Sequence, residues 1–226
     1  MKKYILLSLA LSTVLLTNCK KKEVVKTPSN LYSEYELTYD ENTNKTTVTA
    51  LFREANAFGT NVQLANSTDI SFEGTNLDWV QFGSYYQKEF TGNKGSGTFK
   101  WKDDADKEHS NYAILLAGIT FPVVDTIHTT VNYNFQWLGF ANQSGQKVGL
   151  YVDGVSLTNL ALYYENTATN GNSITMLASQ LQSQGVGSAG CIMERSQYAS
   201  ATDVTQAGGT NKSKYRALNK TIYLKP

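Results

Sequence analysis

Most of the chain alternates hydrophobic and polar residues in short runs, which is typical of strands with one buried face. In the stretch SEYELTYD, the residues Tyr35, Leu37 and Tyr39 fall on one face and polar residues fall on the other. Residues 41–44 (ENTN) are turn formers, and residues 45–52 (KTTVTALF) alternate again. This pattern predicts a β-hairpin.

Five further runs show the same period of two. They are 97–102 (GTFKWK), 130–140 (TVNYNFQWLGF), 147–152 (KVGLYV), 159–166 (NLALYYEN) and 220–224 (KTIYL). In the second run, one face collects Val131, Tyr133, Phe135 and Trp137. In the third run, Val148, Leu150 and Val152 are expected to point inward. The many threonines and the 14 tyrosines suit strands with polar outer faces.

Residues 173–185 break this pattern. Ile174, Leu177, Ala178 and Leu181 recur at helical intervals, and Gly185 is a plausible stop for a helix. We therefore predict a short helix here, with a strand as the alternative.

The number of short strands and the regular turns between them predict an all-β fold with antiparallel β-sandwiches. Two sandwiches, at residues 31–121 and 122–226, fit domain sizes better than one, although one remains possible. The boundary is placed where Pro122 interrupts an extended segment. The pattern resembles the tandem immunoglobulin-like modules of bacterial surface lipoproteins.

The first residues of the chain look like an export signal. Lys2 and Lys3 precede an apolar run at residues 4–16, which is too short for a membrane-spanning helix. Residues 15–19 (LLTNC) resemble the lipobox of bacterial lipoproteins, with Asn18 in place of the usual small residue, as in the looser boxes of Bacteroidetes.

This resemblance implies that residues 1–18 are a cleaved signal peptide and that Cys19 becomes lipidated. Residues 19–30 would then form a tether to the lipid of the outer membrane. The lysines at 20–22 stand where surface-exported lipoproteins carry acidic residues, which favours the periplasmic face over the cell surface. An ordinary secreted protein is the alternative. The second cysteine, Cys191, is expected to be buried and inert.

Composition excludes one class of partner. The formal net charge is +1 and 17% of the residues are charged, so no electrostatic footprint for nucleic acid is present.

The sequence contains one weak cofactor motif. Residues 185–190 (GVGSAG) match the dinucleotide fingerprint, with Asp203 downstream, but polar residues precede the motif in place of a buried strand. We expect no cofactor and interpret this segment as a flexible loop.

Two acidic stretches are candidates for calcium loops. Asp40, Asn42 and Asn44 alternate like the start of such a loop, but Lys45 occupies the position of the required glycine. The second stretch contains Asp103, Asp104, Asp106 and Glu108. Solvated turns explain both stretches, and we expect no metal.

No motif of a known catalytic centre is present. His109 and His128 lie in separate predicted elements, and no nucleophile can be assigned to the pair of Asp125 and His128. We expect a non-catalytic protein and keep an unrecognised hydrolase as a third hypothesis.

Outward aromatic residues are the candidate binding groups. Alternation turns one residue of each adjacent tyrosine pair away from the core, and Tyr151 points opposite its valine and leucine neighbours. The candidates are Tyr85, Tyr86, Tyr151, Tyr163 and Tyr164. The tripeptide 125–127 (DTI) fits the O-glycosylation sequon of Bacteroidetes and makes Thr126 a candidate acceptor.

These observations lead first to a lipid-anchored accessory subunit that binds an envelope protein partner. The alternative is a glycan-binding or adhesion module that uses the outward tyrosines. A structural role of these tyrosines, as cover for a sheet edge or domain interface, is the simpler explanation.

Overall fold

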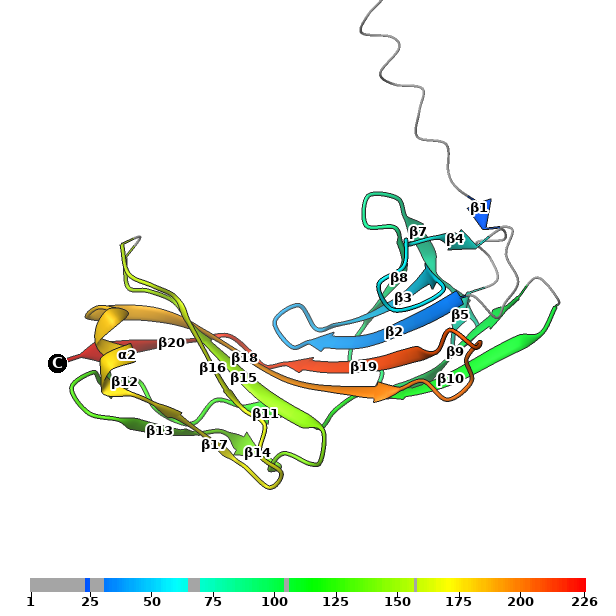
Figure 1. The fold of residues 1–226 in the computed structure, drawn as a ribbon. Coiled ribbons are helices and arrows are strands. Elements are labelled where there is room, and N and C mark those ends of the chain that lie inside the picture. Colours follow the sequence, from blue (N-terminus) through cyan, green and yellow to red (C-terminus); the bar gives the residue numbers. More distant parts are fainter. Residues whose placement is uncertain (1–22, 25–30, 65–69, 104–105, 157) are drawn as a thin grey trace, which may run out of the picture.

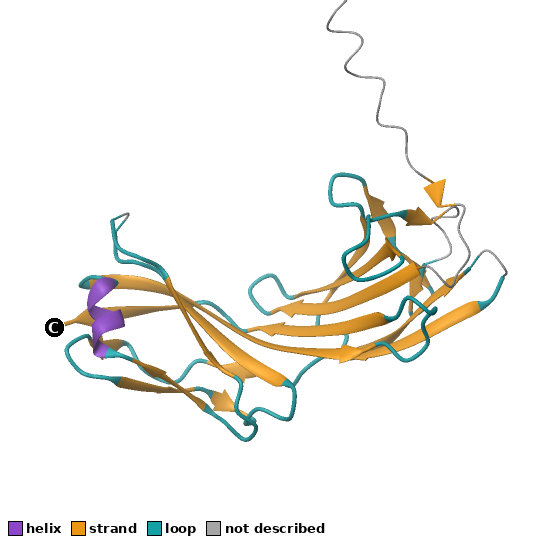
Figure 2. Ribbon diagram, viewed as in Figure 1, coloured by secondary structure: helices purple, strands orange, loops and turns teal. Residues whose placement is uncertain are grey.

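The computed structural model describes the chain except for residues 1–22, 25–30, 65–69, 104–105 and 157, so the predicted signal peptide, the predicted lipidation site Cys19, and Asp104 lie outside the described residues. The described part is an elongated molecule with two β-rich lobes, and α2 (Ala178–Ser183) is its only helix (Figures 1 and 2). Each lobe consists of two layers of strands. The predicted all-β sandwich fold is confirmed.

The first lobe is built on a long hairpin. Strands β2 (Leu31–Asp40) and β3 (Lys45–Glu54) pair along their whole length, and residues 41–44 form the turn between them. Tyr35 and Leu37 on β2 are fully buried, because alternate side chains point to the same face of a strand. The predicted hairpin is therefore confirmed.

Two sheets face each other in this lobe, β19-β2-β3-β8-β7, in which β19 is Gly209–Arg216, and β10-β9-β5-β6. The remaining strands are β4 (Gln63–Leu64), β5 (Ser71–Phe72), β6 (Thr75–Asn76), β7 (Asp78–Val80), β8 (Tyr85–Thr91), β9 (Ser96–Lys102) and β10 (Glu108–Ile114), and β1 (Glu23–Val24) pairs in parallel with β4. Aromatic rings join the layers: Tyr35 lies 4.8 Å from Phe99, and Phe52 lies 5.0 Å from Trp101, between ring centroids. Such contacts between large buried rings contribute much of the packing energy of a small lobe.

The second lobe places one layer, β16-β15-β18-β20-β12, over two short strand pairs, β13-β17 and β11-β14. Its elements are β11 (Ile119–Thr120), β12 (Thr126–His128), β13 (Tyr133–Gln136), β14 (Leu138–Gly139), β15 (Gln146–Val152), β16 (Leu162–Asn166), β17 (Ser173–Met176), α2 and β20 (Lys220–Lys225). Val148, Leu150 and Val152 are buried as predicted.

One strand runs through both lobes. The first part of β18 (Gly187–Ser200) pairs with β20 in the second lobe, and its last part pairs with β19 (Gly209–Arg216). Strand β19 then pairs in parallel with β2 of the first lobe. The ranges 31–121 and 122–226 therefore share one continuous sheet, and not all of its strand pairs are antiparallel.

Two local expectations differ from the structure, and a third is met in both of its alternatives. Residues 187–190 of the predicted flexible loop open β18, where Gly190 leaves room for the Asp153 carboxylate: a β-carbon there would lie 2.6 Å from Asp153 Oδ2. The run at 130–140 is broken: only residues 133–136 form β13, and Val131 is exposed. Residues 173–185 contain both expected elements, since β17 is followed by α2, and Gly185 has the positive φ of a helix stop.

Candidate ligand-binding face

The candidate site lies on the outer face of the continuous sheet, where β16, β15, β18 and β19 run side by side. In the register of the two strands, Tyr151 on β15 is directly opposite Tyr163 on β16. Both side chains point outward, because Leu150 and Tyr164 occupy the inward positions. The two outward rings lie 4.6 Å apart between centroids at an angle of 44°. They are 46% and 42% exposed, so both present ring surface to solvent.

A groove of about 150 Å³ begins beside this tyrosine pair. Its lining residues are Lys147, Gly149, Tyr151, Tyr163, Glu194, Ser196, Tyr198 and Lys214. Gly149 contributes to the depth of the groove, because it has no side chain to fill the space between the strands. Tyr198, at the far side, is 58% exposed, and Lys212 Nζ lies 5.6 Å from the centroid of its ring.

Charges of alternating sign border the groove. Lys147 Nζ lies 3.4 Å from Glu165 Oε2, and Tyr163 Oη donates a hydrogen bond of 3.1 Å to the same carboxylate. On the other side, Lys214 Nζ lies 3.9 Å from Glu194 Oε2. The face therefore offers both hydrogen-bond donors and acceptors next to aromatic rings.

Two of the residues that line the groove, Tyr163 and Lys147, have raised pKa values. Partial burial raises the pKa of Tyr163, and its hydrogen bond to Glu165 raises this pKa further, so the phenol stays neutral. Burial lowers the pKa of Lys147, but the nearby Tyr163 and Glu165 outweigh this effect and raise it overall. The ammonium group stays charged.

The other predicted site residues are not brought to this face. Tyr86 and Tyr164 are buried in the core, where Tyr86 Oη accepts a hydrogen bond of 2.9 Å from Leu64 N and Tyr164 Oη donates one of 3.2 Å to Gln184. Their proposed role in surface binding is therefore wrong. Tyr85 is half-buried in the first lobe, and Thr126 is exposed on β12.

Sequence reasoning missed half of the groove. Tyr198, Glu194 and Lys214 come from β18 and β19, and the register of these strands with β15 brings them beside Tyr151 and Lys147. The alternation of buried Ala189, Cys191 and Met193 with the half-buried Ile192 and Glu194 was a usable signal.

The two acidic stretches have internal partners. In the first, Asn42 N donates a hydrogen bond of 2.9 Å to Asp40 Oδ1, which stabilises the turn. In the second, the expectation of a solvated turn is wrong for Asp103, because its side chain is buried. Its Oδ2 lies 3.1 Å from His109 Nε2. Across the described residues, no group of three or more His, Cys, Asp or Glu side chains could hold a metal ion.

His109 belongs to a buried polar cluster that the sequence did not indicate. Its ring stacks on Trp101 at 4.5 Å, and its Nδ1 lies 3.1 Å from Asp203 Oδ1. Asp203 also accepts a hydrogen bond of 2.8 Å from Ser110 N. These contacts attach the loop between β18 and β19 to β10, which is a structural role.

Cys191 is buried, as expected. Burial, assisted by the nearby Asp153, raises the pKa of its thiol to about 12. No helix within the described residues is long and apolar enough to cross a membrane.

No family model matches the chain, and no curated protein matches it. One similar solved structure concerns the host cell surface retention of a 1.5-MDa bacterial ice-binding adhesin. It has 14% identity and a TM-score of 0.26, and the match covers 85% of this chain and 65% of that one. A tetra-tandem repeat from the extending region of a large adhesion protein has 11% identity and a TM-score of 0.25, with 84% and 49% covered. The chain thus spans less than two thirds of either neighbour, and TM-scores this low support no argument.

Proposed function

We propose that the protein is a non-catalytic envelope module that binds carbohydrate on its outer sheet face. The observation that carries this proposal is the exposed pair of Tyr151 and Tyr163 at the edge of a charged groove. A pyranose ring has an apolar C–H face that packs on aromatic rings and a rim of hydroxyl groups that need donors and acceptors. The tyrosine pair supplies the aromatic rings, and Lys147, Glu194 and Lys214 supply the hydrogen-bond donors and acceptors.

The composition of this face favours a sugar over a protein subunit as its ligand. The core of a protein–protein interface is depleted of charged residues, especially Lys and Glu. Here the rings are bordered by Lys147, Glu165 and Glu194, each of which would have to lose water beneath a protein partner. Small polar ligands can instead share hydrogen bonds with these groups and with ordered water.

A glycan array with purified chain tests this function. We expect at least one polysaccharide to bind, and the signal to be lost in Tyr151→Ala and in Tyr163→Ala. Tyr223→Ala is the matched control, because Tyr223 is a tyrosine of similar exposure on β20, outside the groove. A protein that binds no glycan on the array, or whose binding is equally reduced by the control substitution, would contradict the proposal.

We also propose that the module is anchored through acylated Cys19 at the outer membrane, with the periplasmic face favoured. The support is the lipobox-like sequence at residues 15–19. Cys19→Ala should move the protein from the detergent phase to the aqueous phase in phase partitioning. Retention of the variant in the detergent phase would rule the anchor out.

A further inference from the structure

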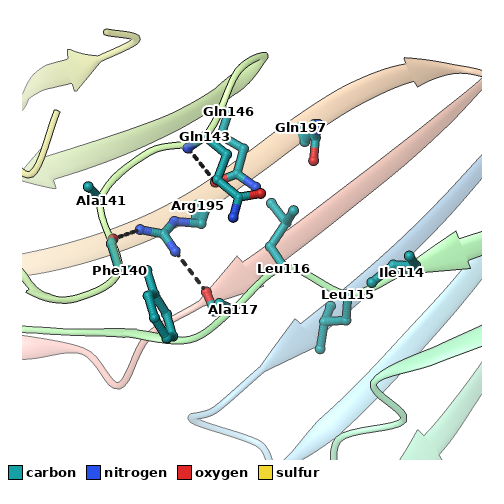
Figure 3. A pocket seen from close by; sticks show the side chains of 10 residues that line it. All are labelled: Ile114, Leu115, Leu116, Ala117, Phe140, Ala141, Gln143, Gln146, Arg195 and Gln197. Atoms are coloured by element: carbon teal, nitrogen blue, oxygen red, sulfur yellow. Dashed lines mark hydrogen bonds between the residues drawn. The ribbon is translucent and has the colours of Figure 1, made fainter. Parts of the chain in front are cut away.

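A second pocket, unrelated to the tyrosine face, lies where the two lobes meet. Its volume is about 370 Å³, which is within the range of small-molecule sites. The residues that line it are Ile114, Leu115, Leu116, Ala117, Phe140, Ala141, Gln143, Gln146, Arg195 and Gln197. Figure 3 shows their side chains, which come from the end of β10 and the segment after it, from residues 140–146 and from the strand β18.

The pocket has one charged residue, Arg195, and no acidic one. Arg195 points inward from β18 and is only 1% exposed. Its guanidinium donates hydrogen bonds to two backbone carbonyl oxygens, from Nη1 to Ala117 (3.2 Å) and from Nη2 to Phe140, as the dashed lines in Figure 3 mark. A guanidinium has five N–H donors, and Nε has no partner among the described residues.

A buried cation normally has an anionic partner, because removing a charge from water is costly. No ion pair within the described residues includes Arg195. Burial lowers the pKa of Arg195, but an arginine side chain remains protonated in proteins. The wall of the pocket therefore has a positive charge whose only partners in the described chain are neutral carbonyl groups.

A second donor lies in the same pocket. Gln146 is 7% exposed, and its Oε1 accepts a hydrogen bond of 3.1 Å from Gln143 N. This contact fixes the amide and leaves its Nε2 group without an acceptor in the described part of the chain. Leu116 and Phe140 add apolar surface beside these donors.

We propose that this pocket binds a small organic monocarboxylate. The carboxylate accepts hydrogen bonds from Arg195 and Gln146, and the apolar group of the ligand packs against Leu116 and Phe140. A single guanidinium with an amide donor matches one negative charge, and planar carboxylates are the preferred partners of arginine. The apolar walls select against inorganic anions, which have no group to place there.

The test is a titration of the Cys19→Ala chain in which NMR monitors the chemical shifts of the backbone amides. The ligands are isovalerate and its neutral isostere isovaleramide. We expect saturable shifts at Leu116, Phe140 and Gln146 with isovalerate and none with isovaleramide. Equal binding of the amide, the absence of saturable shifts, or shifts confined to residues outside the pocket would overturn the proposal.

Two substitutions assign the donors. Arg195→Gln should weaken binding about tenfold or more, since hydrogen bonds to charged groups are the stronger ones. Arg53→Gln makes the same change on the outer face of the first lobe, where Arg53 pairs with Glu34, and should leave binding intact.

Arg195→Gln also removes two contacts to backbone carbonyls and could prevent folding. Gln146→Met then decides the case, because it removes the amide donor at similar volume and should weaken isovalerate binding several-fold. Unchanged affinity in a folded Arg195→Gln or in Gln146→Met would refute the assigned donors.

Discussion

The ring of Tyr163 lies across Gly149 on the neighbouring strand, so closely that a β-carbon at Gly149 would stand 2.4 Å from Tyr163 Oη. The two residues are diagonal neighbours on the outer face, because Gly149 is directly opposite Glu165. The exposed position of the tyrosine pair therefore depends on the absence of a side chain at Gly149.

Gly149→Ala should displace Tyr163 and separate it from Tyr151. We expect glycan binding to fall as far as in Tyr163→Ala. The free energy of unfolding should fall by only about 0.2–1 kcal/mol, the usual contribution of a cross-strand pair, because the exposed ring of Tyr163 can move aside. In a Tyr163→Ala background the same substitution should cost nothing, because the obstacle is gone. Urea unfolding of the two single variants and the double variant measures this coupling. If the changes in the free energy of unfolding are additive, Gly149 and Tyr163 are not coupled.

Asp203→Ala should destabilise the first lobe. It removes the acceptor for Ser110 N and one partner of buried His109, a loss of about 1–3 kcal/mol in the free energy of unfolding. Asp78→Ala is the control, because Asp78 makes an exposed ion pair with Lys88 and should cost less than about 1 kcal/mol. If urea unfolding shows a similar loss in the free energy of unfolding for both variants, the contacts of Asp203 with the His109 cluster do not stabilise the protein.

Glu36 should make the free energy of unfolding decrease as the pH falls into the acidic range. Burial alone would raise the pKa of Glu36, but the hydrogen bond and charge of Lys212, with Thr38 and Lys214, outweigh it and lower the pKa below its ordinary value of 4.5. A carboxyl group with a lowered folded-state pKa stabilises the protein above the unfolded value and loses this contribution as the pH falls through the folded value.

Glu36→Gln should therefore reduce the loss of stability below pH 4.5, as measured by urea unfolding at a series of pH values. Glu89→Gln, which breaks the exposed pair with Lys45, should keep the acid dependence of the parent. Identical pH profiles for the parent and Glu36→Gln would contradict the prediction.

Cys191 should not react in the folded protein. Its thiol is buried and its pKa is about 12, so very little nucleophilic thiolate is present at mildly alkaline pH. In the Cys19→Ala chain, a disulfide reagent that absorbs on reaction should label Cys191 only after urea is added. Fast stoichiometric labelling without urea would show that this part of β18 opens.

The first predicted domain should not fold alone. A fragment of residues 31–121 lacks β19, which pairs with β2 over residues 209–216, and it also lacks Asp203 beside His109. We expect poor amide dispersion in the NMR spectrum of this fragment and a folded spectrum for residues 31–226. A dispersed spectrum from the short fragment would mean that the first lobe is independent of the C-terminal strands.

The sequence predicted the parts of the fold that depend on neighbouring residues. The hairpin predicted from residues 33–52 needs only alternation and a four-residue turn, and the structure has both strands and the turn. The pairing of β19 with β2 joins segments separated by most of the chain, and alternation within a strand contains no information about such a partner.

The same limit applies to the candidate sites. Tyr151 and Tyr163 were identified because each lies beside inward residues of its own strand. Tyr198 and Lys214 required the register of three strands, and Arg195 required knowledge that its strand has a buried face at the junction of the lobes. The glycine-rich segment was misinterpreted because glycine is common in loops, whereas here the small residues allow side chains such as Asp153 to approach the strand.

The path of β18 and β19 also determines when the protein can mature. A ribosome releases the amino end first, so the residues of the first lobe are available long before the strand that completes their sheet. Until residues 209–216 arrive, one edge of β2 stays open, and an open edge readily pairs with other chains. The newly made first lobe therefore needs protection from aggregation until residues 209–216 have been made and have paired with β2.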